Sequence, residues 1–325
     1  MKYSIGIDLG GTDIKAGLLS ESGGISCRLV MPTQADAGAT GVASRIAEAI
    51  RQVFQAAQSA AIDRTDVVGI GIGSPGLIVA QTGVVHFSPN FPGWSDIPLK
   101  EYVKAELAGL NLPIFIDNDV NAMTLGEFHH GAGVGLQNMV CLTLGTGVGG
   151  GVVIDGKVYH GSSNTAGELG HTVVMPDGRL CGCGNLGCLE AYAGARHIVE
   201  RTIRHIHLSR RSSNLTEKVS NLFNLTPKLI SEAAQAGDEL AIEILAETGR
   251  YIGIALASIA HILNPQMAII GGGIAEAGEK LLFEPIRAEV KKRAMDIPAQ
   301  TMQIVKARLG NDAGLVGSAM LAFNA

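Results

Sequence analysis

"IGIDLGGTDIK", residues 5–15, joins a short apolar strand to a second apolar strand through a turn with two glycines. Apolar runs at 5–9 and 14–19 around such a turn are typical of a β-hairpin. The same order returns about 135 residues later, where "MVCLTL", "GTGVGGG" and "VVI" are followed by the turn Asp155-Gly156 and "KVYH". The two segments predict an internal repeat, weak in identity but matched in the order of its elements.

Strands alternate with helical patterns around these hairpins. Further strands are predicted at 67–72, 113–116 and 267–270, and Ser74-Pro75-Gly76 after the first of them is a type II turn signal. Helices are predicted at 42–57, from Asp119 to Gly131, twice within 226–263, and after Gly271-Gly272-Gly273. The alternation predicts an α/β protein. The polar residues 192–227 carry no clear pattern.

Length and glycine content narrow the class of protein. A chain of 325 residues exceeds the usual size of one domain, so two domains are expected. Glycine supplies 43 residues, about 13% of the chain against a background of about 7%. The glycines gather at the ends of apolar runs, where tight turns and close ligand approach need them.

The charge argues against nucleic-acid and membrane partners. The net charge is −5 and the pI about 6.0. The basic run 201–211 is predicted to be the solvated face and end of a helix, with a phosphate contact as the alternative. The apolar segment near 252–263 is too short for a membrane span and suits a buried helix. An acidic residue and a glycine turn interrupt the N-terminal apolar run before the apolar core of a signal peptide could form. A cytoplasmic protein with reduced thiols is therefore expected.

Both glycine turns are candidate phosphate-binding loops. Asp8 ends a strand beside Gly10, Gly11 and Thr12, so that backbone N–H groups can wrap a polyphosphate while the carboxylate holds Mg²⁺ through water. The second turn, "LGTGVGG" at 144–150, has the same character. Neither is a Walker A loop or a dinucleotide fingerprint. An ordinary hairpin turn is the alternative for each, but two such turns in one chain favour a nucleotide site.

"FIDNDVNA", residues 115–122, is the candidate catalytic element. Asp119 follows a buried strand and opens a helix, so it projects from a rigid scaffold. As an alternative, Asp119 is only a helix N-cap, stabilised by the helix dipole. That alternative accounts for one of the three polar residues Asp117, Asn118 and Asp119. A base for phosphoryl transfer needs only a positioned carboxylate that accepts the hydroxyl proton.

"CGCGNLGCLE", residues 181–190, holds three of the five cysteines. With one histidine they form a His-Cys₃ set that suits tetrahedral Zn²⁺: His171, Cys181, Cys183 and Cys188. A disulfide does not suit a reducing compartment, and the Cys-x-x-Cys of a redox pair is absent. Iron–sulfur ligation needs a fourth cysteine, but Cys27 and Cys141 lie in apolar strands. The set is closed, which predicts a structural metal.

Two glutamates flank this loop, Glu168 in "GELGH" and Glu190 in "CLE". A metal that fixes the loop also fixes these carboxylates, which can then accept hydrogen bonds from the vicinal hydroxyls of a sugar. The alternative is that both are ordinary surface residues.

Taken together, the segments resemble the ROK family (repressors, open reading frames and sugar kinases). The resemblance rests on "IGIDLGGTDIK", "GIGSPGLI", "IDNDVNAMTLGE", "LTLGTGVGGG", "GELGH", "CGCGNLGCLE", "NPQMAIIGGGI" and "ARLGNDAGLVGSAMLA" in this order. It spans almost the whole chain. Asp117 stands where many relatives carry glutamate, a difference without expected effect on the chemistry.

The resemblance implies an α/β, actin-like (ribonuclease H-like) two-domain sugar kinase fold with the active site in an interdomain cleft. A small N-terminal domain would cover 1–118, with about 306–325 returning to it, and a larger domain with the zinc loop would cover 119–305. Homodimers or homotetramers are common in the family.

The resemblance also implies roles for residues at matching positions. Asp119 would be the catalytic base, and the sugar would be bound by Asn90, Asn118, Asp119, Glu168, His171 and Glu190. ATP would be bound by Asp8, Gly10, Gly11, Thr12, Lys15, Gly145, Thr146, Gly147 and Gly272. The cofactors would be ATP, Mg²⁺ and a structural Zn²⁺.

The implied reaction is ATP-dependent phosphorylation of a hexose at its 6-hydroxyl, with glucose as the first expectation. N-acetylmannosamine, N-acetylglucosamine, fructose and allose are the alternatives. A sugar-responsive transcriptional repressor is the alternative of another class. Such repressors carry an N-terminal DNA-binding segment, for which a glycine turn just after residue 8 leaves no room. A sugar-binding module without activity is disfavoured because Asp119 and both turns are intact.

Overall fold

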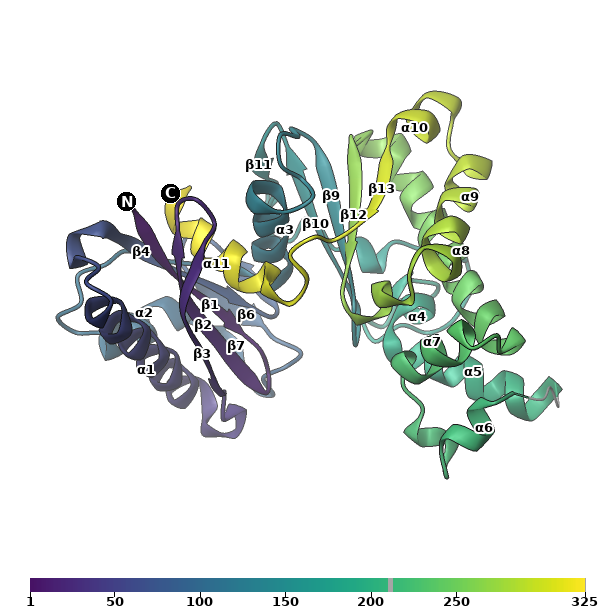
Figure 1. Cartoon of the computed structure of the whole chain (residues 1–325), viewed down its shortest axis with the longest axis horizontal. Coiled ribbons are helices and arrows are strands. Elements are labelled where there is room, and N and C mark those ends of the chain that lie inside the picture. The colour runs from purple at the N-terminus through teal and green to yellow at the C-terminus, as the bar shows by residue number, and fades with distance from the viewer. Residues whose placement is uncertain (210–212, 325) are drawn as a thin grey trace. The chain divides into compact units, whose positions relative to one another are not determined.

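A computed structural model of the chain describes residues 1–209 and 213–324 and divides them into two compact units (Figure 1). Unit 1 comprises Met1–Gly135, Val158–Ala166 and the chain from Arg308 onward, and unit 2 comprises Leu136–Lys157 and Gly167–Ala307. Unit 1 thus continues past the boundary expected at residue 118. The C-terminal segment that begins at Arg308 belongs to unit 1.

Unit 1 contains a five-stranded sheet in the order β3-β2-β1-β4-β8. The strands are β1 (Tyr3–Leu9), β2 (Asp13–Ser20), β3 (Ile25–Pro32), β4 (Val67–Ser74) and β8 (Ile114–Asn118). β1 and β2 are antiparallel, which confirms the first hairpin, whereas β4 is parallel to both β1 and β8. A separate small sheet holds β5 (Leu77–Val79), β6 (Val84–Phe87) and β7 (Ser95–Ile97).

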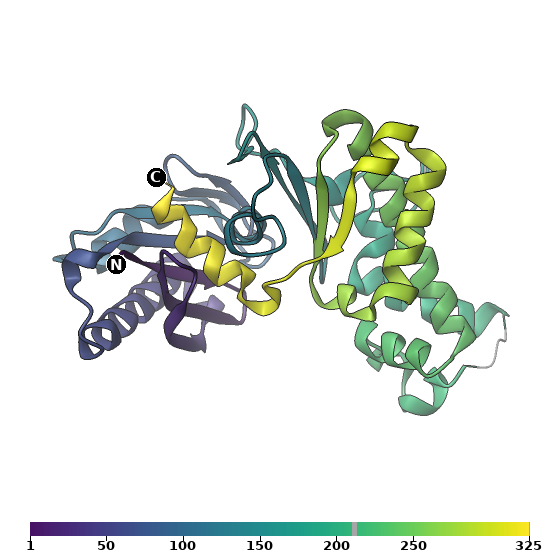
Figure 2. The same cartoon turned by 45° about the horizontal axis from the view of Figure 1, so that its top comes forward.

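Helices cover the larger sheet of unit 1, and α11 (Ala313–Phe323) lies along its N-terminal strands (Figure 2). Side chains of a strand alternate between its two faces. Ile5 and Ile7 join the core that contains α1 (Gly38–Ser59) and α2 (Leu99–Glu106), whereas Ser4 Oγ donates to Ala319 O of α11 at 2.7 Å. The N-terminal strand and the C-terminal helix therefore pack together.

The helix α3 (Asp119–His130) explains why unit 1 extends past residue 118. α3 packs against α11 through glycines: a β-carbon at Gly126 would lie 2.6 Å from Ala313 O, and one at Gly317 would lie 1.6 Å from Ala122 O. Only glycine permits so close an approach of two helices. Because α11 also packs on β1 and β4, α3 belongs to the first unit.

Glu127 secures the return of the chain to α3. Its side chain is completely buried and accepts hydrogen bonds from three backbone N–H groups, those of Ala132 at 2.9 Å, Arg308 at 3.1 Å and Leu309 at 2.7 Å. Arg308 is the first residue of the C-terminal part of unit 1. The carboxylate thus ties the end of α3 to the point where the chain re-enters the unit.

Unit 2 repeats the topology of unit 1, with the order β11-β10-β9-β12-β13. The strands are β9 (Met139–Leu144), β10 (Val148–Ile154), β11 (Lys157–Val158), β12 (Met267–Gly271) and β13 (Gln303–Lys306). β9 and β10 are antiparallel, and β12 is parallel to β9 and β13. The internal repeat predicted from the two hairpins is confirmed at the level of the sheets.

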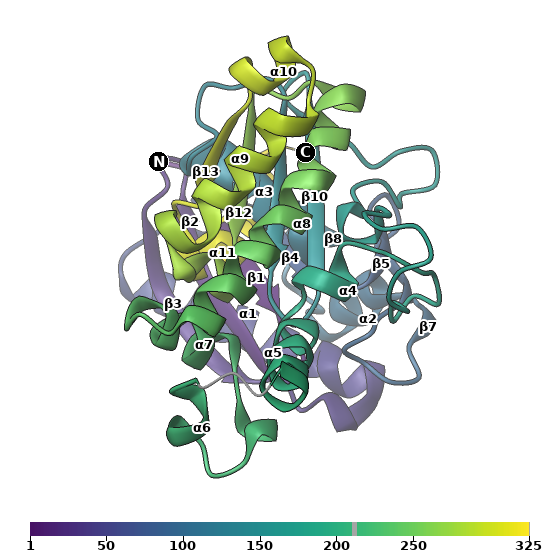
Figure 3. The same ribbon diagram turned by 90° about the vertical axis from the view of Figure 1, so that its right-hand side faces the viewer.

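Helices including α7 and α8 share an apolar cluster with the second sheet, and α9 runs beside the long helix α8 (Figure 3). The helices of unit 2 are α4 (Glu190–Ala193), α5 (Ala195–Ser209), α6 (Leu215–Lys218), α7 (Pro227–Gln235), α8 (Glu239–Leu263), α9 (Glu284–Arg293) and α10 (Asp296–Thr301). The helix predicted after Gly273 begins as a 3₁₀ turn, Gly273–Ala277, followed by a π-helical turn, Glu279–Phe283. Within the described residues, no helix is long and apolar enough to cross a membrane.

The basic run at 201–211 differs from its prediction at Arg201. This side chain is buried and donates to Tyr192 O at 3.0 Å and Ile244 O at 3.1 Å, and its Nε lies 3.1 Å from a carboxylate oxygen of Glu247. Burial lowers the pKa of Arg201, and the partners compensate its charge. Arg201 therefore braces α5 from inside the unit. The last two residues of the run, 210 and 211, lie outside the described residues.

Candidate active site

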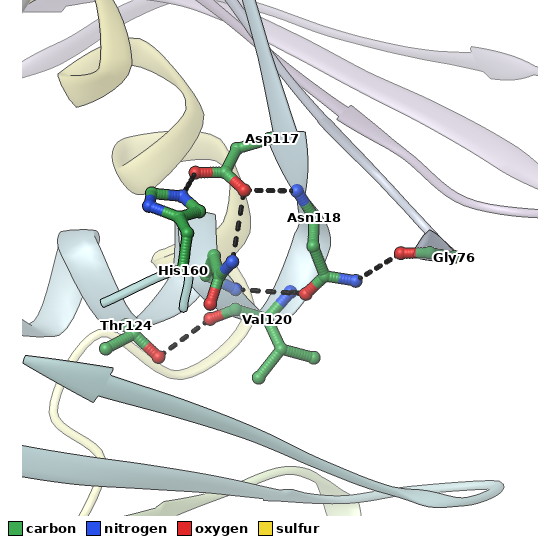
Figure 4. Close-up of polar contacts among 7 residues, drawn as sticks. Gly76, Asp117, Asn118, Val120, Thr124 and His160 are labelled. Atoms are coloured by element: carbon green, nitrogen blue, oxygen red, sulfur yellow. Dashed lines mark hydrogen bonds and ion pairs between the residues drawn. The ribbon is translucent and has the colours of Figure 1, made fainter. Parts of the chain in front are cut away.

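The candidate base Asp119 lies at the junction of β8 and α3 (Figure 4). The N-cap of α3 is its neighbour Asn118 and not Asp119. Asn118 is the N-cap: its Oδ1 accepts from Val120 N at 2.8 Å and Asn121 N at 3.1 Å, and its Nδ2 donates to Gly76 O at 2.9 Å. Asp119 is the first residue of the helix and is half-buried. Capping is thus the work of Asn118, and the proposal that Asp119 is only the N-cap is wrong.

Asp117, the third polar residue of this junction, is buried and has hydrogen-bond partners on both oxygens. Oδ1 accepts from Asn118 N at 2.7 Å and Asn121 Nδ2 at 3.1 Å, and Oδ2 lies 2.7 Å from Nε2 of His160 (Figure 4). This hydrogen bond raises the pKa of His160. Sequence reasoning missed His160 because 43 residues separate it from Asp117.

The first glycine turn connects β1 and β2 and is held from behind by Thr33. Gly10 N donates to Asp13 O at 2.9 Å, while Thr33 donates from its N–H to Thr12 O at 2.8 Å and from its hydroxyl to Gly10 O at 2.7 Å. Thr33 is completely buried. A β-carbon at Gly11 would lie 3.4 Å from the β-carbon of Asn90. An expected sugar contact and an expected phosphate turn are therefore neighbours in unit 1.

Asp8 lies at the start of the same turn. Burial raises the pKa of Asp8, and Lys15 offsets part of the effect through an ion pair of 3.4 Å. A β-carbon at Gly314 would lie 2.8 Å from the Asp8 carboxyl carbon, so the first turn of α11 runs beside this carboxylate. A half-buried carboxylate beside backbone N–H groups and a lysine is suited to a hydrated Mg²⁺ and the phosphates that it carries.

The second glycine turn, between β9 and β10, is open at Gly145. Gly145 N donates to Gly147 O at 3.0 Å, yet among the described residues, Gly145 and its two chain neighbours apart, no atom lies within 4 Å of the position of a β-carbon at Gly145. Gly147 and Gly272 are glycines for packing reasons: a β-carbon at Gly147 would lie 2.3 Å from Glu190 Oε2, and one at Gly272 would lie 2.3 Å from Leu144 O. Space for a ligand is therefore evident at Gly145 alone among these three.

Glu190 connects the second turn to the cysteine cluster. Its Oε2 accepts from Val148 N at 3.0 Å, and Cys181 Sγ lies 3.5 Å from its Oε1. Glu168 is exposed, and its Oε2 lies 3.9 Å from His171 Nε2. Both glutamates that are expected to contact the sugar are therefore adjacent to expected metal ligands.

The His-Cys₃ set converges as expected, with one ligand atom from each residue and all four atoms within 4.8 Å of one another. His171 Nδ1 lies 3.6 Å from Cys181 Sγ, and the Sγ atoms of Cys183 and Cys188 are 3.7 Å apart. Zn–S bonds of about 2.3 Å and Zn–N bonds of about 2.0 Å predict tetrahedral edges of about 3.5–3.8 Å. Geometry and donor chemistry therefore fit zinc.

The expected site residues thus form two groups. Unit 1 holds Asp8, Gly10, Gly11, Thr12, Lys15, Asn90, Asn118 and Asp119, and unit 2 holds Gly145, Thr146, Gly147, Glu168, His171, Glu190, Gly272 and the cysteines. In unit 1 the first glycine turn neighbours Asn90 through Gly11, and in unit 2 the second glycine turn neighbours Glu190 through Gly147.

The sequence profile of the ROK family matches residues 4–325 of this chain. The chain belongs to the ROK family. The glucokinase of Thermotoga maritima is 40% identical over 317 residues, which cover 98% of this chain and 96% of the relative. The glucokinase of Halalkalibacterium halodurans is 37% identical over 321 residues, 98% of this chain and 94% of the relative.

A solved structure of the same family has the same fold. The crystal structure of a ROK family glucokinase from Streptomyces griseus in complex with glucose and AMPPNP superposes with a TM-score of 0.82 at 35% identity. It covers 99% of this chain and 100% of that chain. The expected α/β, two-domain, actin-like sugar kinase fold is confirmed.

Proposed function

We propose that this ROK protein transfers the γ-phosphoryl group of ATP to the 6-hydroxyl of a hexose, with glucose as the preferred substrate. The observation that carries the proposal is the position of Asp119: it opens α3 while Asn118 does the capping, so that its carboxylate is not needed to start the helix. The two glucokinase relatives and the glucose–AMPPNP complex of the S. griseus enzyme support the choice of substrates.

In the proposed reaction the Asp119 carboxylate accepts the proton of the 6-hydroxyl as the new O–P bond forms and ADP leaves. Asn90 and Asn118 offer amide groups to the sugar. Asn118 Nδ2 has two N–H groups, of which one donates to Gly76 O. The other is available to a sugar hydroxyl, so capping and sugar binding by Asn118 are compatible.

Phosphate binding is assigned to the two glycine turns. Backbone N–H groups of Gly10, Gly11 and Thr12 would contact the phosphates together with Lys15, and Asp8 would hold Mg²⁺ through water. In unit 2, Gly145, Thr146, Gly147 and Gly272 would complete the ATP contacts. Mg²⁺ would neutralise the charge that develops on the transferred group.

Sugar binding in unit 2 is assigned to Glu168, His171 and Glu190. Zinc held by His171 Nδ1, Cys181, Cys183 and Cys188 would stabilise the loop and would leave no open position for catalysis. His171 would bind zinc through Nδ1 and present Nε2 on the side of Glu168, 3.9 Å away. Such a loop holds two carboxylates and one imidazole N–H for the hydroxyls of the hexose.

We further propose a homodimeric or homotetrameric enzyme of the cytoplasm. The proposal follows the habit of the family and the chemistry of the His-Cys₃ set, whose thiols must stay reduced to bind a metal. Size-exclusion chromatography with light scattering measures the oligomeric state.

The proposal is tested by ADP release, coupled to an NADH-linked assay, over glucose, fructose, mannose, allose, N-acetylglucosamine and N-acetylmannosamine. We expect hexose-dependent ADP release with the highest kcat/KM for glucose. A higher kcat/KM for an N-acetylhexosamine would keep the assignment as a sugar kinase but change the assigned substrate. If the protein binds these sugars but none of them causes ADP release, a sugar-responsive regulator would be favoured.

A further inference from the structure

The segment Val158–Ala166 belongs to unit 1, although the chain on both sides of it belongs to unit 2. Val158 packs in the apolar cluster that includes Leu125 of α3, and the ring of His160 reaches Asp117 at the end of β8. Ala166 N donates to His160 O at 3.0 Å and closes the segment into a loop. The segment is thus attached to the end of β8 and to α3, the two elements that meet at the candidate base Asp119.

Asp117 depends on this histidine. Its side chain is only 5% exposed, and a buried carboxylate is strongly disfavoured unless hydrogen bonds compensate it. Two donors satisfy Oδ1, whereas the partner described for Oδ2 is His160 Nε2 at 2.7 Å. The hydrogen bond with Asp117 raises the pKa of His160, and the ring can donate to Oδ2 through an N–H at Nε2.

The hydrogen bonds on the other oxygen lead to the base. Asp117 Oδ1 holds the N–H of Asn118, which is the N-cap of α3, and the side chain of Asn121 in the first turn. Figure 4 shows His160, Asp117 and Asn118 in line at the end of β8. A displaced Asp117 would rotate the backbone at the junction from which Asp119 projects.

We propose that His160 is a positioning residue: it fixes Asp117, and through Asp117 it fixes the direction in which Asp119 meets the sugar hydroxyl. The inference rests on the proposed function, in which Asp119 is the base. Misplacement of a reacting group by about 1 Å can cost on the order of 100-fold in rate. The effect falls on kcat and spares the KM for ATP, whose assigned contacts lie in the glycine turns.

The test uses three substitutions of His160 in the full-length protein. Glutamine can bring an amide N–H to the place of Nε2, whereas asparagine reaches only the place of Nδ1, and leucine has no donor. We expect His160→Leu and His160→Asn to lower kcat by about 10- to 100-fold with the KM for ATP within about twofold. His160→Gln should stay within about threefold of the parent protein.

A double substitution isolates the path through Asp117. If His160 acts through Asp117, the variant with both Asp117→Asn and His160→Leu loses no more kcat than Asp117→Asn alone, because residues of one network are not additive. Additive losses would overturn the inference, as would an undiminished His160→Leu or a His160→Gln as slow as His160→Asn. If His160→Leu does not fold, the glutamine and asparagine pair decides. A parent protein without hexose-dependent ADP release overturns the proposed function itself, whereas an active parent with unaffected variants overturns only the role of His160.

Discussion

Asp119 is the proposed catalytic base, whereas its neighbour Asn118 is the N-cap of α3. Substituting each residue in turn therefore compares a loss of catalysis with a loss of stability. Asn118 accepts two backbone hydrogen bonds as the N-cap of α3 and donates one to Gly76 O. Loss of an N-cap costs about 0.5–2 kcal/mol, and loss of a further hydrogen bond costs about 1 kcal/mol. Asn118→Ala should therefore lower the free energy of unfolding by about 1.5–3 kcal/mol.

Asp119→Asn should cost much less stability. The Asp119 carboxylate accepts from Val120 N at 3.0 Å, but this N–H also donates to Asn118 at 2.8 Å, so it keeps a partner after the substitution. The lost interaction with the helix dipole is worth about 0.3–1 kcal/mol. In contrast, kcat should fall by about 10²- to 10⁴-fold, because the 6-hydroxyl loses its proton acceptor.

The two variants are compared by thermal unfolding and by steady-state kinetics with saturating sugar and ATP. For a unit of this size, 1 kcal/mol corresponds to about 2–4 °C in Tm, so Asn118→Ala should lose about 3–12 °C and Asp119→Asn less than about 4 °C. The reasoning is refuted if Asp119→Asn keeps more than about a third of the parent kcat, or if its Tm falls as far as that of Asn118→Ala.

Three further results are expected. Gly145→Ala should leave Tm unchanged, since within the described part of the chain only its own neighbours in sequence lie within 4 Å of the added β-carbon, but should raise the KM for ATP several-fold; an unchanged KM would remove Gly145 from the nucleotide site. Metal analysis should find about one zinc per chain, and Cys183→Ser should release it and weaken sugar binding before ATP binding, whereas Cys27→Ser should do neither; metal-free protein with full activity would contradict the zinc assignment. Glu127→Gln should lower the free energy of unfolding by about 1–3 kcal/mol, because an amide N–H₂ must face backbone N–H groups that now donate to a carboxylate; an unchanged urea midpoint would contradict this account.

Features with a local cause were predictable from the sequence. Both hairpins follow from apolar runs around glycine turns, and the ends of α3 follow from a polar cluster at 117–119 and from Gly131. The His-Cys₃ set converges because its spacing already brings three thiols into one short loop. In each case the residues that interact lie within 17 positions of one another, and turn chemistry or spacing limits the alternatives.

Two kinds of feature were not predictable: a choice between two neighbouring residues that suit the same role, and contacts between residues that lie far apart in the sequence. Asn118, and not Asp119, is the N-cap because its backbone is extended, with φ −60° and ψ 143°, and either residue type can cap a helix. The boundary of unit 1 depends on the close packing of Gly126 and Gly317, which are 191 positions apart and carry no pattern that pairs them. Arg201 belongs to a polar run but is buried, because backbone carbonyls and Glu247 compensate its charge.

The central claim is that Asp119 serves phosphoryl transfer to a hexose, and the product of the reaction tests it most directly. Protein incubated with glucose, ATP and Mg²⁺ is followed by ³¹P nuclear magnetic resonance, which distinguishes phosphate on the 6-hydroxyl from phosphate on other hydroxyls and from free phosphate. We predict one glucose 6-phosphate for each ADP with the parent protein and almost none with Asp119→Asn. Free phosphate in place of a sugar phosphate, or equal product from the two proteins, would contradict the claim.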